Sequence, residues 1–228
     1  MRINPKDLFS SIPDIIADLF YDGDFPVSAL RGLRDALSGI ISNPPEGMTS
    51  IGDGVIIGRG VVIEDGATIL PPTVIMDGAT IRQGAYIRGG VFVGKGAVVG
   101  HCTEVKNSIL MDKAQAPHFN YVGDSILGAG AHLGAGAILS NLKSDKSSVS
   151  IRNGDEAYDT GLKKLGALVG DRAEIGCGAV LNPGSVIGKN SAVYPLVSWR
   201  GVLAENSIAK SGDIVIKKEL TLPSSFIG

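Results

Sequence analysis

Histidine, arginine and lysine supply the most suggestive chemistry in this sequence. The chain has three histidines, His101, His118 and His132, and imidazole is the side chain best suited to take a proton from an attacking amine near neutral pH. Arg88 and Lys106 stand 18 residues apart, and two such cations can hold one phosphate if the fold brings them together. The alternatives are surface histidines and two solvated cations. The choice depends on the elements that position these side chains.

An aliphatic or other apolar residue returns at every sixth position in the ranges 51–111, 121–139 and 169–193, and glycine often follows it. This period fits neither a helical face nor one long alternating strand, and it predicts a repeat architecture. Hexads of this kind build a parallel β-helix, an all-β solenoid in which each hexad is a short strand and three hexads make one coil. Coils stack at about 4.8 Å, so a separation of 18 residues places Arg88 and Lys106 side by side on one face.

The first interruption of the repeat contains His118. Ten residues separate Met111 from Tyr121 where six are expected. The surplus predicts a short loop around residues 116–119 that is expelled from the solenoid. Loops on rigid scaffolds often carry functional side chains.

The second interruption separates Leu139 from Val169. An Asn-Gly turn at 153–154 between short β-prone arms predicts a projecting hairpin. This insertion spans about residues 143–166, and its lysines and arginine make it basic.

The N-terminal segment is predicted to be helical. Asn4-Pro5 is typical of a helix start, and an apolar stripe at helical spacing over residues 30–41 ends before Pro44-Pro45. Since the first coil of a solenoid has an unpaired edge, we expect the helices to cover that edge. The expected units are a helical cap at 1–45, the hexapeptide-repeat domain at 46–210 and a C-terminal tail at 211–228 with one strand that pairs within its own or another subunit.

Composition narrows the class of protein. The chain has 228 residues, 44% hydrophobic content, 32 glycines and 5% aromatics, which suits a thin aliphatic core. A net charge of −2 gives no reason to expect nucleic acid or an anionic membrane as a partner. The polar first residues predict neither a signal peptide nor a membrane span, so we expect a cytoplasmic protein. Cys102 and Cys177 are expected to be reduced thiols.

Longer motifs carry a resemblance to a known family. They are Tyr86-Ile87-Arg88-Gly89, Glu104-Val105-Lys106-Asn107-Ser108, residues 116–124, Leu133-Gly134-Ala135-Gly136, Asn141 and residues 160–166. Together they resemble the acetyltransferase domain of the bifunctional glucosamine-1-phosphate acetyltransferase/N-acetylglucosamine-1-phosphate uridyltransferases. The archaeal-type sugar-1-phosphate nucleotidylyltransferase/acetyltransferases are the most similar branch. The resemblance covers roughly residues 50–210, and it alone implies that the solenoid is left-handed.

The resemblance implies an acetyl-CoA-dependent N-acetyltransferase that acts on an amino-sugar 1-phosphate in UDP-N-acetylhexosamine and cell-envelope sugar-nucleotide synthesis. His118 matches the catalytic base, and the backbone N–H of Ala135 matches the donor to the thioester oxygen, where negative charge develops. Acetyl-CoA is then a co-substrate, no metal is needed, and the enzyme is a homotrimer with sites between adjacent solenoids. The residues implied at the sugar phosphate are Arg88, Lys106, Tyr121, His132 and Asn141, and those implied at acetyl-CoA are Ala135, Cys177, Pro195 and Arg200.

Two departures from the family pattern leave the substrate open. His132 stands where the bacterial enzymes have asparagine, and Leu142 stands where they have tyrosine. Glucosamine and galactosamine 1-phosphate both remain candidates. No glycine-rich nucleotide loop opens the chain, so nucleotidyltransferase activity is not expected from it.

Two other classes of protein share features with this sequence. A zinc lyase like the γ-type carbonic anhydrases shares the solenoid, but its ligand spacing differs from His101, His118 and His132, which stand 17 and 14 residues apart. A non-catalytic, sugar-phosphate-binding solenoid is the other alternative. The combination of Arg88, Lys106 and His118 argues against it, because a scaffold has no need of all three.

Overall fold

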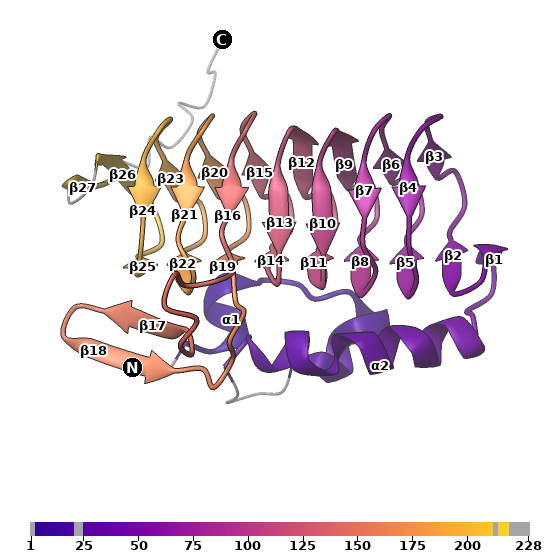
Figure 1. Ribbon diagram of the computed structural model, residues 1–228, viewed down its shortest axis with the longest axis horizontal. Coiled ribbons are helices and arrows are strands. Elements are labelled where there is room, and N and C mark those ends of the chain that lie inside the picture. Colours follow the sequence, from indigo (N-terminus) through magenta and orange to yellow (C-terminus); the bar gives the residue numbers. More distant parts are fainter. Residues whose placement is uncertain (1–2, 21–24, 212–213, 219–228) are drawn as a thin grey trace, which may run out of the picture.

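The computed structural model describes residues 3–20, 25–211 and 214–218, and in it the chain forms a left-handed parallel β-helix (Figure 1). Three sheets of nine, nine and seven strands run along the solenoid, and successive coils pair in parallel register. We name them sheets A, B and C in the order in which each coil visits them.

Sheet A contains β1 (Thr49–Gly52), β2 (Val55–Ile57), β5 (Thr73–Ile75), β8 (Val91–Val93), β11 (Ser108–Leu110), β14 (Ile126–Leu127), β19 (Ala167–Val169), β22 (Ser185–Ile187) and β25 (Val202–Leu203). Sheet B contains β3 (Val62–Ile63), β6 (Thr80–Ile81), β9 (Val98–His101), β12 (Gln115–His118), β15 (His132–Leu133), β20 (Glu174–Ile175), β23 (Ala192–Val193), β26 (Ser207–Ser211) and β27 (Ile214–Lys217). Sheet C contains β4 (Thr68–Ile69), β7 (Tyr86–Ile87), β10 (Glu104–Lys106), β13 (Tyr121–Gly123), β16 (Ile138–Leu139), β21 (Val180–Leu181) and β24 (Ser198–Trp199).

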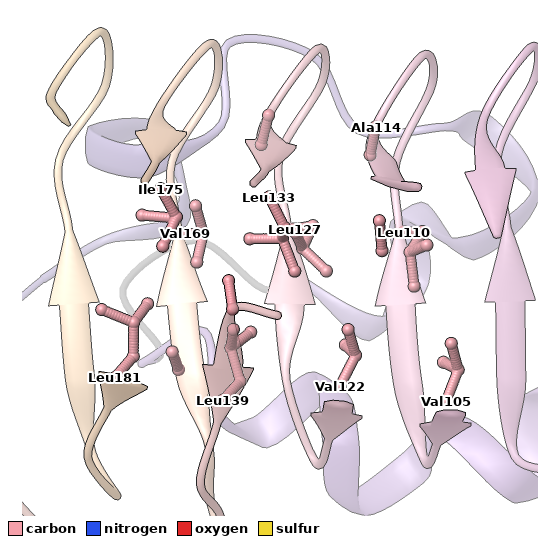
Figure 2. Close-up of a cluster of buried hydrophobic side chains, with 14 of the residues drawn as sticks. Val105, Leu110, Ala114, Val122, Leu127, Leu133, Leu139, Val169, Ile175 and Leu181 are labelled. Carbon is pink, nitrogen blue, oxygen red and sulfur yellow. The ribbon is translucent and has the colours of Figure 1, made fainter. Parts of the chain in front are cut away.

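The hexad residues fill the interior of the solenoid, as predicted. Val105, Leu110, Val122 and Leu127 point inward from β10, β11, β13 and β14 and are fully buried (Figure 2). Alanines such as Ala114 occupy the corners of this core. Burial of these aliphatic side chains is the main stabilising term of the solenoid.

The expelled loop predicted at residues 116–119 is wrong. Gln115–His118 is strand β12, which pairs with β9 so that His118 lies beside His101. Val98, Gln115 and His132 stand in register, so a coil here has 17 residues, whereas Thr80 and Val98 are 18 apart. The short corner follows sheet C, where two non-glycine residues have positive φ, Asn107 (45°) and Asp124 (47°).

The short corner displaces the hexad count by one residue. Leu110 and Val122 therefore face the core instead of Met111 and Tyr121. Met111 is instead buried in a second hydrophobic cluster, and Tyr121 is partly exposed on sheet C.

The N-terminal helices lie along the outer face of sheet A (Figure 1). They are α1 (Pro5–Leu8), the 3-10 helix η1 (Asp14–Leu19) and α2 (Ser28–Ser42). Leu33 and Leu37 of α2 join Phe92, Ile109 and outward-facing residues of other coils in the second hydrophobic cluster. The expected position over the edge of the first coil is wrong, because this apolar face needs cover more than the edge does.

Antiparallel strands meet the outermost coils instead. β1 pairs with β2 at the first edge of sheet A. The predicted tail strand, β27, pairs antiparallel with β26 of the same chain at the far edge of sheet B. These hairpins occupy backbone groups that a terminal coil would otherwise leave unpaired.

The predicted hairpin in the insertion is confirmed as β17 (Ser150–Asn153) and β18 (Glu156–Asp159), with Gly154 at φ 57° in its turn. It does not project freely. Ile151 is buried against sheet A, and the rings of Phe25 and Tyr158 stack at 4.6 Å. The helices and the hairpin together cover sheet A, so sheets B and C are the faces that the described residues leave open.

Replacing Phe92 with alanine should destabilise the fold by about 3–5 kcal/mol, because the ring is fully buried between sheet A and α2 and its loss leaves a cavity. Thermal unfolding measures this loss. Phe119→Ala is the matched control, since Phe119 is 56% exposed. Equal losses in the two variants would show that the helices do not form a packed layer on sheet A.

None of the helices in the described part of the chain has the length and apolar character that a membrane crossing needs.

Candidate active site

Four predicted residues form one column where sheet B turns toward sheet C. The column is defined by backbone hydrogen bonds between successive coils. The N–H groups of Phe119, Gly136, Gly178 and Leu196 donate to the carbonyls of His101, His118, Ala135 and Cys177 over 2.9, 3.0, 2.8 and 2.9 Å. His101, His118, Ala135, Cys177 and Pro195 therefore occupy equivalent places in consecutive coils.

His118 ends β12 with its imidazole exposed. The backbone holds its position: the His118 N–H donates to Asn120 Oδ1 over 3.1 Å. Asn120 is buried, and its Nδ2 donates to the Gly134 carbonyl over 2.8 Å. The imidazole has no hydrogen-bond partner among the described residues. It is therefore available to a substrate.

Ala135 is the next member of the column and is exposed. Its backbone N–H has no acceptor within the part of the chain that the structure describes. Cys177 is the next member of the column, and its thiol is free and exposed; the thiol of Cys102, which follows His101, is also free and exposed. The unpaired N–H of Ala135 thus lies one coil from the exposed imidazole of His118.

Arg88 and Lys106 lie side by side on sheet C, as predicted, because the Arg88 N–H donates to the Val105 carbonyl over 2.8 Å. Each cation has a carboxylate partner. Arg88 Nη1 bonds Glu104 Oε1 at 2.7 Å, which raises the pKa of Arg88. Lys106 Nζ lies 3.5 Å from Asp124 Oδ2. Guanidinium and ammonium groups carry five and three N–H donors, so both cations retain donors for a phosphate.

Tyr121 and Asn141 meet in front of a glycine. A Cβ at Gly123 would lie 2.6 Å from the Tyr121 hydroxyl and 2.7 Å from Asn141 Nδ2, so only glycine fits beneath them. The pKa of Tyr121 is raised, first by burial and then by the charges of Glu104 and Asp124. The phenol therefore keeps its proton and remains a hydrogen-bond donor.

Spectrophotometric titration should show the raised pKa of Tyr121. Burial and the neighbouring carboxylates favour the neutral phenol, so its ionisation should lie above the usual tyrosine value of about 10. Any stability linked to this shift is complete below about pH 10 and is lost as the pH rises through the folded-state pKa. Tyr121→Phe should remove this late transition from the titration curve. Loss of an early transition instead would contradict the burial of the ring.

Two predicted residues are not brought to this place within one chain. His132 begins β15 on sheet B, where its Nδ1 lies 3.0 Å from Glu174 Oε2, so it does not share a face with Arg88. Arg200 follows β24, at the opposite end of sheet C from β7.

Two further observations concern metal ligands and cavities. The described residues contain no group of three or more histidine, cysteine, aspartate or glutamate side chains that could hold a metal. Two cavities, of about 640 and 360 Å³, lie under the N-terminal segment at Met48 and Met76 and at Ile3 and Val202, and His118 lines neither of them. His118 and Ala135 are exposed on the surface of the single chain.

Sequence reasoning gave no role to Gly123, Glu104 or Asp124. Glu104 and Asp124 stand within two and three residues of predicted site residues. Their pairing with the cations depends on how neighbouring coils align, which motif reading alone did not supply.

Comparison with known proteins supports the resemblance. Residues 69–154 match the family model described as the GMPPB C-terminal domain. A bifunctional sugar-1-phosphate nucleotidylyltransferase/acetyltransferase of Sulfurisphaera tokodaii is 34% identical over 42% of this chain and 24% of its own length. The bifunctional protein GlmU of Methanococcus maripaludis is 32% identical over 54% of this chain and 28% of its own.

The predicted resemblance is confirmed over about half of the chain. The chain spans only about a quarter of the length of these curated relatives.

Solved structures match the chain at lower sequence identity. The UDP-N-acetylglucosamine acyltransferase of Francisella novicida is 14% identical, with a TM-score of 0.46, over 68% of this chain and 58% of that one. PerB of Caulobacter crescentus, solved with CoA and GDP-perosamine, is 20% identical, with a TM-score of 0.32, over 68% and 52% of the two chains. At these scores neither structure bears on the ligands of this chain.

Proposed function

We propose that this chain is an acetyl-CoA-dependent N-acetyltransferase that acts on an amino-sugar 1-phosphate, either glucosamine or galactosamine 1-phosphate. The observation that supports this most directly is the column in which an exposed imidazole, His118, precedes the unpaired N–H of Ala135. The cation pair Arg88 and Lys106 lies on the adjoining sheet. The similarity to sugar-1-phosphate acetyltransferases supports the same reaction.

The proposed reaction assigns one task to each group. His118 takes a proton from the sugar amine as its nitrogen attacks the thioester carbonyl. The Ala135 N–H donates to the oxygen that becomes negative in the tetrahedral intermediate. The carbon–sulfur bond then breaks, and His118 returns its proton to the departing CoA sulfur. The products are the N-acetylated sugar phosphate and free CoA.

Arg88 and Lys106 hold the phosphate in this proposal, with Tyr121 and Asn141 at the sugar. Cys177 and Pro195 continue the column toward acetyl-CoA, and Arg200 is proposed to reach a phosphate of CoA. His132 lies on another face of the same chain, so its proposed contact with substrate would have to come from a neighbouring subunit.

A homotrimer is proposed on the same grounds. A convex solenoid offers its substrates little enclosure, and binding between two copies would provide it. Sedimentation should give three times the chain mass of 23.5 kDa. A fully active monomer would contradict a shared site. We place the enzyme in the cytoplasm and in UDP-N-acetylhexosamine synthesis.

Product identification tests the function. The protein is incubated with acetyl-CoA and either glucosamine 1-phosphate or galactosamine 1-phosphate, and mass spectrometry and proton NMR are used to find an N-acetyl group on the sugar. The proposal expects N-acetylation of one or both. Binding of the sugar phosphates without any product would instead favour the non-catalytic solenoid.

A further inference from the structure

Asp124 is a buried carboxylate next to the proposed sugar-phosphate site. It follows β13 at the corner between sheets C and A, and only 6% of its surface is exposed. A buried carboxylate needs hydrogen-bond donors to compensate its lost hydration. The proposed reaction gives it no direct contact with substrate.

Three donors from neighbouring coils converge on this carboxylate. Asn141 Nδ2 donates to Oδ2 over 2.5 Å, and Lys106 Nζ lies 3.5 Å from the same oxygen. Asn107 Nδ2 donates to Oδ1 over 2.9 Å. The Tyr121 hydroxyl and Asn141 Nδ2 both lie in front of Gly123. Asp124 is therefore bonded to two of the four side chains proposed to hold the sugar phosphate on sheet C, Lys106 and Asn141.

We propose that Asp124 is a positioning residue that fixes Lys106 and Asn141 for the sugar phosphate without touching it; this inference rests on the proposed function. The Lys106 ammonium ends a flexible stem, and ordering such a stem costs conformational entropy. The Asp124 carboxylate holds the ammonium and so orders the stem before substrate binds. Substrate binding then does not carry that entropic cost. A carboxylate can only accept, so it also orients Asn141 with Nδ2 inward, which leaves Oδ1 as an acceptor for a sugar hydroxyl.

The backbone at this corner does not depend on the carboxylate. The Asp124 N–H donates to the Lys106 carbonyl, and the Asp124 carbonyl accepts from the Gly166 N–H, both over 2.9 Å. The residue has a φ of 47°, which asparagine tolerates as well as aspartate does. Asp124→Asn should therefore preserve the corner and remove only the charge and one acceptor oxygen.

Steady-state kinetics with the full chain separate positioning from folding. In Asp124→Asn the new amide group faces donors, so the KM for the amino-sugar phosphate should rise by about 10- to 100-fold. The KM for acetyl-CoA should not change. An unchanged KM for the sugar phosphate, in a wild type that turns over, would overturn the positioning role while leaving the proposed function intact.

Two control variants test two general effects: the loss of a buried carboxylate elsewhere in the chain, and the loss of another hydrogen bond to Asp124. Asp171 is also buried, but its oxygens accept from the backbone N–H groups of Ala129 and Ser10, so Asp171→Asn should lower the melting temperature and leave both KM values unchanged. Asn107→Gly keeps the positive φ and removes a donor that leads to no substrate residue. It should also leave KM unchanged. A KM increase in either control equal to that of Asp124→Asn would reject the specific role.

A readout without turnover keeps the test independent of the proposed function. Lys106 is acetylated with acetic anhydride, and its rate of labelling is measured by mass spectrometry against that of exposed Lys95. Without its carboxylate partner, Lys106 should label faster in Asp124→Asn than in wild type. Equal labelling would overturn the inference even if no amino sugar proves to be a substrate.

Discussion

His118→Ala should lower kcat by about 10²- to 10⁴-fold, the usual contribution of a general base. The exposed imidazole at the end of β12 has no partner among the described residues that would give it a structural task. Its removal should leave the KM for both substrates nearly unchanged, because Arg88, Lys106 and the acetyl-CoA column remain. CoA release under steady-state conditions near neutral pH measures the effect.

His101 provides the control for this experiment. It lies one coil earlier in the same column, and its Nδ1 bonds the Gln83 carbonyl at 2.9 Å. His101→Gln retains a donor for that carbonyl and should keep most of the turnover. Equal losses of kcat in the two variants would mean that any substitution in this column of residues impairs turnover. The loss in His118→Ala would then be no evidence that His118 is the base.

Arg88→Ala and Lys106→Ala should each raise the KM for the amino-sugar phosphate by about 10- to 100-fold, because a hydrogen bond to a charged group contributes about 1.5–3 kcal/mol. The increase in KM should occur only with the phosphorylated sugars. Activity toward unphosphorylated glucosamine, which we expect to be low in the wild type, should change little in either variant. Initial rates across a range of sugar concentrations give both values.

Arg59→Ala is the matched control for Arg88→Ala. Arg59 also bonds a carboxylate, with Nη2 3.3 Å from Asp77 Oδ2, but it lies far from the cation pair. A similar increase in KM on losing Arg59 would indicate a general effect of net charge. No change in either cation variant would place the phosphate elsewhere on the chain.

The hexads predicted the solenoid because the same physical demand recurs in every coil: one aliphatic residue must face the core. They could not predict the path between Met111 and Tyr121. A ten-residue gap is equally compatible with an expelled loop and with a corner one residue shorter than the rest. Only the pairing of β12 with β9 decides between them.

The sequence contains a pattern that indicates where the helices lie, and the six-residue period alone does not reveal it. Strands of sheet A are apolar at consecutive positions, as in Val91-Phe92-Val93 and Val55-Ile56-Ile57, whereas strands of sheets B and C alternate more. A strand buried on both faces requires such a run. The outward residues Phe92 and Ile56 therefore identify the face that α2 and the insertion cover.

Part of the candidate site could be predicted from the sequence, because the repeat sets the length of a coil. Coil length alone places Arg88 beside Lys106, and the motif resemblance selects His118 and Ala135. The carboxylates behind the cations depend on side-chain direction across coils, which periodicity does not fix. The motif does not specify the face on which His132 lies, and the pairing of β12 with β15 places it on sheet B.

Turnover of the wild-type protein tests the central claim most directly. CoA release from acetyl-CoA is followed with glucosamine 1-phosphate, galactosamine 1-phosphate, unphosphorylated glucosamine and no acceptor. The account predicts CoA release that requires an amino sugar, is fastest with one of the two 1-phosphates and is matched by N-acetylated product. Release no faster than acetyl-CoA hydrolysis with every acceptor, from a folded protein that binds the sugar phosphates, would contradict it.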